Sequence, residues 1–106
     1  MSEMGRNPVL GKAVTGAADN AATADGRNHW QWCWTGVFAG GGVRGGQAIG
    51  ESDEWAGFPN SQEYYPSDMA ATIFECLSLD PTTEVRDTQD RPIAISRGHV
   101  IRDLFR

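Results

Sequence analysis

Basic residues are few in this sequence, and they form no cluster. Only 9 of the 106 residues are Lys or Arg, against 14 Asp or Glu, so the formal net charge is −5. Nucleic acids and anionic membrane surfaces attract proteins through clustered Lys and Arg side chains. We therefore expect no nucleic-acid partner for this chain.

Long apolar runs are also missing. No stretch approaches the roughly 18 consecutive apolar residues that a membrane-spanning helix needs. The N-terminal residues lack the basic segment followed by an apolar core that marks an export signal. We expect no membrane span here, and the compartment is left open.

Cysteine is scarce, because the chain has only Cys33 and Cys76. Two cysteines are too few for a disulfide framework, and this pair lacks the close spacing of thiolate zinc sites. Both are interpreted as small buried hydrophobic side chains.

The length of the chain allows one domain at most, with a core near the lower limit for independent stability. Residues 7–28 are small and turn-forming with no apolar period, which predicts a long loop. Loops of this length are uncommon inside compact domains. The loop is therefore either functional or part of something larger than this chain.

Aromatic and β-branched residues predict two short strands between positions 30 and 49. Trp30, Trp32 and Trp34 recur at every second position, and residues 35–39 continue the pattern up to three glycines. Residues 47–49 predict the second strand. The alternation favours a sheet face packed against a helix, and an aromatic platform for a sugar ring is the alternative.

The strongest helix signal covers residues 67–77. Pro66 and Ser67 supply the start signal, and Asp68 lies favourably in the first turn. A spacing of four predicts an apolar face and an opposite polar face: Met69, Ile73 and Leu77 for the first, and Asp68, Thr72 and Glu75 for the second.

Further along, Ile93 and Ile95 alternate with small residues and predict a strand entered from Pro92. Apolar residues between 100 and 105 predict a short terminal helix. The acidic and aromatic loop 51–65 is expected to be exposed.

A glycine-rich run at 40–45 formally fits the G-x-G-x-x-G pattern of dinucleotide-binding loops. Such a loop must open a helix, whereas the residues that follow predict a strand and a turn. A glycine-rich turn with positive φ angles is the favoured interpretation.

Several motifs in fixed order make the chain similar to a known family. They are Ser-Glu-Met-Gly-Arg-Asn-Pro at 2–8, Gly-Arg-Asn-His-Trp at 26–30, and Ala-Gly-Gly-Gly-Val-Arg-Gly-Gly at 39–46, with later agreement at 68–73, 83–87 and 91–92. Together they resemble the C-terminal part of a large uncharacterised bacterial family, the domain of unknown function 1501. That family is placed in the alkaline phosphatase and sulfatase superfamily. The resemblance covers essentially the whole chain.

The resemblance implies an α/β fold. The chain would be the C-terminal part of an alkaline-phosphatase-like three-layer domain, with short strands, one main helix and a short terminal helix. In this superfamily divalent metal ions orient a phosphate or sulfate ester and activate a hydroxyl nucleophile or a water. A zinc, manganese or calcium ion is thus implied for the full-length domain.

The resemblance also suggests which residues would form the site. Glu3 and His29 are similar to metal ligands of the superfamily, and Arg27 is a candidate anion contact. No catalytic nucleophile is assigned. Met4 stands where the superfamily usually has a histidine ligand, and Asn28 stands where relatives commonly have Asp.

The family's nucleophile region and other ligands would precede Met1. We therefore expect the chain to be inactive alone, with the missing N-terminal part of the same domain as its partner. That partner would cover a strand edge and an apolar face left exposed here. The resemblance implies that full-length relatives are exported.

The alternative is a noncatalytic carbohydrate- or protein-interaction module. It would use the tryptophan run together with the exposed aromatic residues Trp55, Phe58, Tyr64 and Tyr65.

Overall fold

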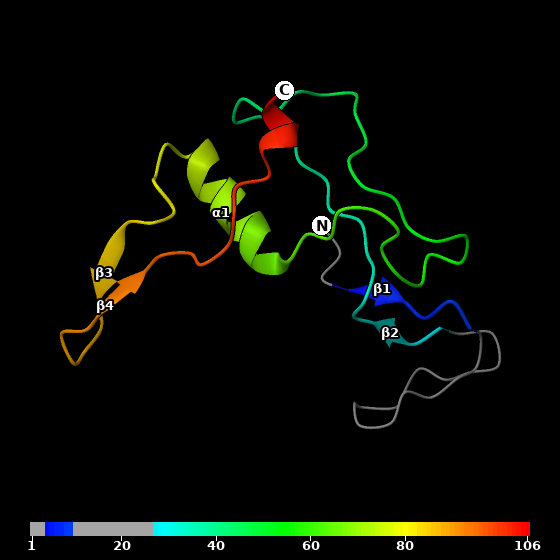
Figure 1. Cartoon of the computed structure of the whole chain (residues 1–106), viewed down its shortest axis with the longest axis horizontal. Helices are drawn as coiled ribbons and strands as arrows, with labels where there is room; N and C mark the ends of the chain where they lie inside the picture. Colours follow the sequence, from blue (N-terminus) through cyan, green and yellow to red (C-terminus); the bar gives the residue numbers. More distant parts are fainter. Residues whose placement is uncertain (1–3, 10–26) are drawn as a thin grey trace. The chain divides into compact units, whose positions relative to one another are not determined.

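The computed structural model describes residues 4–9 and 27–106. Its elements in chain order are β1 (Gly5–Arg6), β2 (His29–Trp30), α1 (Pro66–Cys76), β3 (Glu84–Arg86), β4 (Pro92–Ala94) and the 3-10 helix η1 (Arg102–Phe105), all seen in Figure 1. This mixture of one main helix, short strands and a short terminal helix agrees with the predicted α/β content. No helix in these described ranges is long and apolar enough to cross a membrane.

The chain divides into two compact units. The first comprises the residues up to Val37 together with Gly50–Glu63, and the second comprises Phe38–Ile49 and Tyr64–Arg106. The first unit contains β1 and β2, and the second contains all the other elements. The central part of the predicted 7–28 loop, residues 10–26, lies outside the described residues.

In the first unit, β1 and β2 form a two-stranded antiparallel sheet. Gly5 lies opposite Trp30 and Arg6 lies opposite His29. The ladder continues with a hydrogen bond of 2.8 Å from the backbone N–H of Asn7 to the carbonyl of Asn28. The predicted strand through residues 30–39 is wrong beyond Trp30, because residues 31–39 pair with no neighbouring strand in the described part of the chain.

Helix α1 confirms the predicted helix to within one residue at each end. Pro66 occupies the first turn, where its missing N–H is not needed. The backbone N–H of Tyr65, the residue before the helix, donates a hydrogen bond of 2.8 Å to Oδ2 of Asp68. Asp68 therefore caps the start of the helix that it was predicted to favour.

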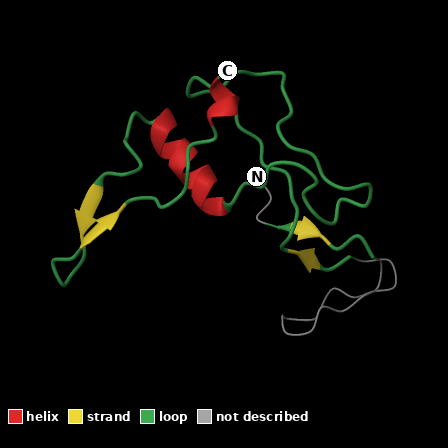
Figure 2. Ribbon diagram, viewed as in Figure 1, coloured by secondary structure: helices red, strands yellow, loops and turns green. Residues whose placement is uncertain are grey.

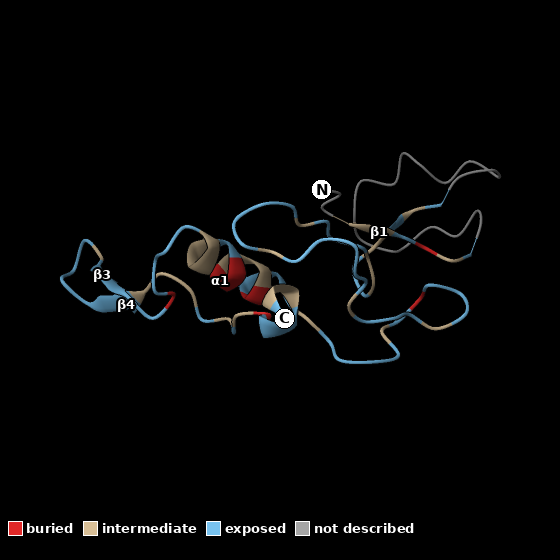
Figure 3. Cartoon of the chain, turned by 90° about the horizontal axis from the view of Figure 1, so that it is seen from above, coloured by how far each residue is buried: buried red, intermediate tan, exposed pale blue. Residues whose placement is uncertain are grey.

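The predicted apolar and polar faces of α1 are wrong. Asp68 and Thr72 are buried at 8% and 0% exposure, whereas Ile73 and Leu77 are 45% and 63% exposed. Figure 3 shows the buried positions of α1 beside the exposed ones. The cause is tertiary hydrogen bonding, since the segment that leads to η1 packs on the polar side of the helix.

Three hydrogen bonds fasten that segment to α1. The carboxylate of Asp68 accepts the backbone N–H of His99, the hydroxyl of Thr72 accepts the backbone N–H of Ile101, and the hydroxyl of Ser96 donates to the carbonyl of Ser67. Ala71 and Ile101 are the buried hydrophobic residues of the described core. The core of the second unit is accordingly small and depends on polar contacts.

Strands β3 and β4 form a hairpin with Val85 opposite Ile93 (Figure 2). The predicted strand after Pro92 is confirmed as β4, and β3 was not predicted. The turn between them is held by Asp87, whose Oδ1 accepts the backbone N–H groups of Gln89 and Arg91.

The glycine-rich segment is a turn, as favoured from the sequence. Gly40, Gly41 and Gly42 all have positive φ angles, and the N–H of Val43 closes the turn on the carbonyl of Gly40. A Cβ at Gly41 would lie 2.8 Å from Cβ of Cys76, which only glycine avoids. Residues 43–50, directly after the turn, form no helix. The predicted strand at 47–49 is absent, and Gln47 instead donates side-chain hydrogen bonds to the carbonyls of Asp103 and Leu104.

Candidate functional site

The candidate ligand His29 lies in β2, and its side chain is exposed. Arg27, two residues earlier, is also exposed. Glu3 lies outside the described residues, immediately before Met4 and β1. Because β1 pairs with β2, the chain segment that carries His29 and the segment that follows Glu3 are held together as one small sheet.

Glu3 and His29 are residue types that bind divalent metals, but two ligands are fewer than a catalytic metal site uses. Imidazole nitrogen and carboxylate oxygen are ordinary zinc donors, and catalytic zinc sites use about three protein ligands. Within residues 4–9 and 27–106, no group of three or more His, Cys, Asp or Glu side chains is placed to hold a metal ion.

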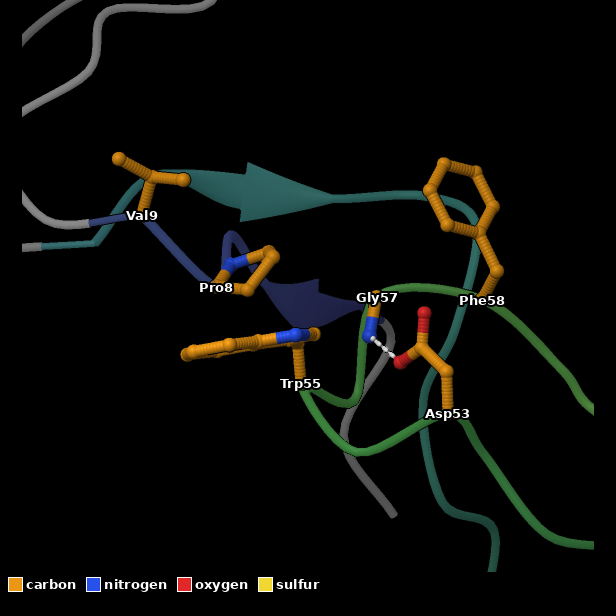
Figure 4. Close-up of a pocket in the computed structure, with 6 residues that line it drawn as sticks. All are labelled: Pro8, Val9, Asp53, Trp55, Gly57 and Phe58. Carbon is orange, nitrogen blue, oxygen red and sulfur yellow. Dashed lines mark hydrogen bonds between the residues drawn. The ribbon is translucent and has the colours of Figure 1, made fainter.

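A pocket of about 550 Å³ opens on the surface of the first unit. It is lined by Pro8, Val9, Asp53, Trp55, Gly57 and Phe58. Figure 4 shows Pro8, Val9 and Trp55 at one end, with Gly57, Phe58 and Asp53 at the other. Its wall is aromatic and aliphatic apart from one carboxylate, and none of the residues Glu3, Arg27 and His29 contributes to it.

Asp53 organises the turn that builds this pocket. Its Oδ1 accepts a hydrogen bond of 2.7 Å from the backbone N–H of Gly57, and its carbonyl accepts the N–H of Ala56. The N–H of Asp53 in turn donates to the carbonyl of Phe58. These bonds hold Trp55 at the tip of the turn, where it is 70% exposed.

Aromatic rings join this loop to the tryptophan run. The ring centroids of Trp30 and Phe58 are 5.6 Å apart in an edge-to-face arrangement, and those of Trp32 and Phe58 are 6.3 Å apart. The indole N–H of Trp30 donates a hydrogen bond of 2.5 Å to the carbonyl of Gly57. Trp30 and Trp32 thus dock the 50–63 loop within the first unit, in place of the predicted sheet face.

Two causes raise the pKa of the Cys33 thiol. Burial raises the pKa of the Cys33 thiol, and the negative charge of Asp53 raises it further. Cys33 and Cys76 are both half-buried and unpaired by disulfide. The predicted full burial of the two cysteines is therefore wrong, because both side chains are only half-buried.

The predicted exposure of Trp55, Phe58 and Tyr65 is confirmed, whereas Tyr64 is half-buried. Asp53, Pro8 and Val9 were not predicted as pocket residues. The one local signal was the Asp53 to Gly57 spacing across a tryptophan, which is typical of a turn closed by an aspartate side chain. The approach of Pro8 and Val9 depends on the β1–β2 pairing and has no local signal.

Comparison with known proteins identifies one family. The family described as "Protein of unknown function (DUF1501)" matches residues 1–105. No curated protein and no solved structure matches the chain. The match includes β1, β2, the glycine turn and every later element of the structure. The chain therefore belongs to the DUF1501 family of proteins of unknown function.

Proposed function

We propose that this chain contributes part of the metal site of a phosphate- or sulfate-ester hydrolase domain of the alkaline phosphatase and sulfatase type, and that it is inactive alone. Glu3 and His29 would bind a zinc, manganese or calcium ion, and Arg27 would contact the anionic group of the ester. The observation that carries this proposal is the pairing of β1 with β2.

The pairing matters because it joins the two motifs that carry the candidate residues. The Asn7 to Asn28 hydrogen bond extends the ladder by one residue beyond β2, on the side toward Arg27. Arg6 lies opposite His29 in the sheet and Arg27 lies two residues before His29, and both arginines are exposed. Guanidinium groups bind phosphate and sulfate oxygens through paired N–H donors, so this sheet offers anion contacts beside a metal-binding imidazole.

The shortage of ligands supports inactivity of the chain alone. When bound, the metal ion would polarise the ester and lower the pKa of a bound hydroxyl or water. Two ligands fall short of the number that holds a catalytic ion firmly. We assign to this chain only metal binding by Glu3 and His29 and anion binding by Arg27, and we assign the other ligands to the N-terminal part of the same domain.

Exposed apolar residues on the second unit support a covering partner. Ile73, Leu77 and Leu79 are 45%, 63% and 49% exposed. Ile73 and Leu77 are one helical turn apart on α1, and exposed apolar side chains at such a spacing are typical of an interaction surface. The proposed N-terminal part of the domain would bury it.

Metal titration tests the proposal. Zinc chloride and manganese chloride are titrated into the purified chain by calorimetry, in parallel with His29→Ala and Glu3→Gln. His99→Ala is the matched control, because His99 has a 98% exposed side chain and no proposed role. We expect each ligand variant to weaken binding by about tenfold or more, since each loses one of two donors.

The control should bind as the unchanged chain does. Equal binding by the unchanged chain and by His29→Ala would remove His29 from the site. Aryl phosphate and aryl sulfate turnover by the chain alone is expected to be undetectable, and robust turnover would contradict the assignment of the missing ligands elsewhere.

A second candidate function is noncatalytic binding through the aromatic residues of the first unit. The observation that favours it is the pocket at Trp55 and Phe58, whose rings are 70% and 50% exposed. Saturable binding of any small ligand at Trp55, without turnover, would support this function.

A further inference from the structure

The pocket of the first unit has a chemical character of its own. Trp55 and Phe58 present aromatic surface, Pro8 and Val9 present aliphatic surface, and Asp53 supplies the charged group (Figure 4). Its volume of about 550 Å³ falls in the range of small-molecule sites, roughly 300–1,000 Å³. This volume and lining suit a small ligand with one polar end.

The charge around the pocket has a single sign along the loop that builds it. Residues 51–63 contain Glu51, Asp53, Glu54 and Glu63, and no Lys, Arg or His occurs between positions 45 and 85. Like charges repel a ligand that carries phosphate, sulfate or carboxylate. The loop therefore disfavours an ester anion and favours a cation.

Asp53 keeps its negative charge available. One carboxylate oxygen, Oδ1, accepts the N–H of Gly57, and Asp53 takes part in none of the ion pairs found among the described residues. A backbone N–H does not neutralise a carboxylate.

Aromatic faces complement this carboxylate. A cation close to the face of a tryptophan or phenylalanine ring is attracted by the ring quadrupole, and tryptophan is the best of these partners. Trp55 is the most exposed aromatic side chain of the pocket. An ammonium group in the pocket would be attracted both by the aromatic rings that line it and by the carboxylate of Asp53.

We propose that this pocket binds a small organic cation that carries an ammonium or alkylated ammonium group. This inference rests on the second, noncatalytic binding function and names its ligand class. A neutral sugar could use the aromatic faces but would gain nothing from the net charge of Asp53, so charge dependence separates the two ligands.

The probe is choline chloride, titrated by calorimetry and by NMR of the Trp55 indole N–H at constant ionic strength. Two comparison probes are the uncharged analogue of choline, in which a tert-butyl group replaces the trimethylammonium group, and maltose. Choline is expected to bind saturably and to shift the Trp55 signal. The affinity for the uncharged analogue is expected to be lower than that for choline by at least about fivefold.

Matched variants locate the charge. Asp53→Asn keeps an oxygen that can accept the Gly57 N–H, so the turn is preserved while the charge is lost. It is expected to weaken choline binding by about fivefold, whereas Glu54→Gln, a neighbouring charge change outside the pocket lining, should weaken it by less than about twofold. Trp55→Ala should abolish the binding, and Trp55→Phe should restore part of it.

Three results would overturn the proposal. Choline could fail to bind, the uncharged analogue could bind equally well, or maltose could bind at Trp55 in place of choline. The last two results would leave the binding function standing with a different ligand. Absence of binding by all three probes would count against the second candidate function as well.

Discussion

The carboxylate of Asp68 accepts a hydrogen bond of 2.7 Å from the backbone N–H of His99, 31 residues later in the chain. Its other oxygen accepts the N–H of Tyr65 at the start of α1. One side chain therefore caps the helix and fastens the segment that leads to η1. This double role explains why an aspartate on the predicted polar face is buried.

Replacing Asp68 should loosen both attachments. In Asp68→Ala the partly buried N–H of His99 loses its charged acceptor, at an expected cost of about 1 kcal/mol. Hydrogen exchange at the His99 and Tyr65 amides measures the effect. Asp68→Asn keeps one acceptor oxygen and should show a smaller increase in exchange. Unchanged exchange at His99 in Asp68→Ala would contradict the role of this bond.

Gly98 is predicted to be irreplaceable where the chain crosses the start of α1. A Cβ at this position would overlap the carbonyl of Ser67 and the backbone nitrogen of Asp68. Gly98→Ala should therefore destabilise the second unit by about 1–3 kcal/mol, as overpacking does. Gly45→Ala is the control, because a Cβ there meets nothing within 4 Å. Chemical denaturation followed by circular dichroism compares the two, and equal stability would refute the close approach.

The β3–β4 turn should weaken on acidification. Hydrogen bonds from the backbone and side chain of Arg91 lower the pKa of Asp87 below its ordinary value. A group with a lowered folded-state pKa stabilises the fold above its unfolded-state pKa and loses that contribution as pH falls through the folded value. NMR of the Gln89 and Arg91 amides should show the turn loosening only below the ordinary carboxyl range. Asp87→Asn should show no such transition, and a transition shared by both chains would assign it to another group.

Cys33 should become more reactive when Asp53 loses its charge. Burial, and then the negative charge of Asp53, raise the pKa of the Cys33 thiol. Asp53→Asn removes the second cause, so the thiolate fraction and the alkylation rate at about pH 8 should rise by roughly twofold. Mass spectrometry after a pulse of iodoacetamide measures the rate, with Cys76 as the internal reference. An unchanged Cys33 rate would place Asp53 too far away to act.

Local signals were enough to predict some elements. Pro66 and Asp68 fixed the start of α1, and the alternation after Pro92 located β4. Both depend on preferences of neighbouring residues, such as proline in the first helical turn and period-two side chains in a strand. The glycine turn is likewise a local signal, because Gly40, Gly41 and Gly42 are adjacent in the sequence and glycine readily adopts the positive φ angles seen there.

The exposed faces and the pocket could not be predicted in that way. Thr72 and Asp68 are buried by partners about thirty residues later, and their hydrogen bonds outweigh the apolar spacing of Ile73 and Leu77. The tryptophan alternation matched a strand, but its rings contact Phe58 from a distant loop. Asp53 joins the pocket only because that loop folds back onto Trp30. Such long-range contacts have no periodic signature in the sequence.

The proposal that His29 is a metal ligand is tested most directly by paramagnetic broadening. Manganese chloride is added in steps to isotope-labelled chain, and the NMR signals that broaden first mark the bound ion. We expect the signals of His29 and its strand partner Arg6 to broaden first, and His29→Ala to abolish that selectivity. First broadening at Asp53 or at the carboxylates of Asp80 and Glu84, with His29 and Arg6 unaffected, would contradict the metal-site account.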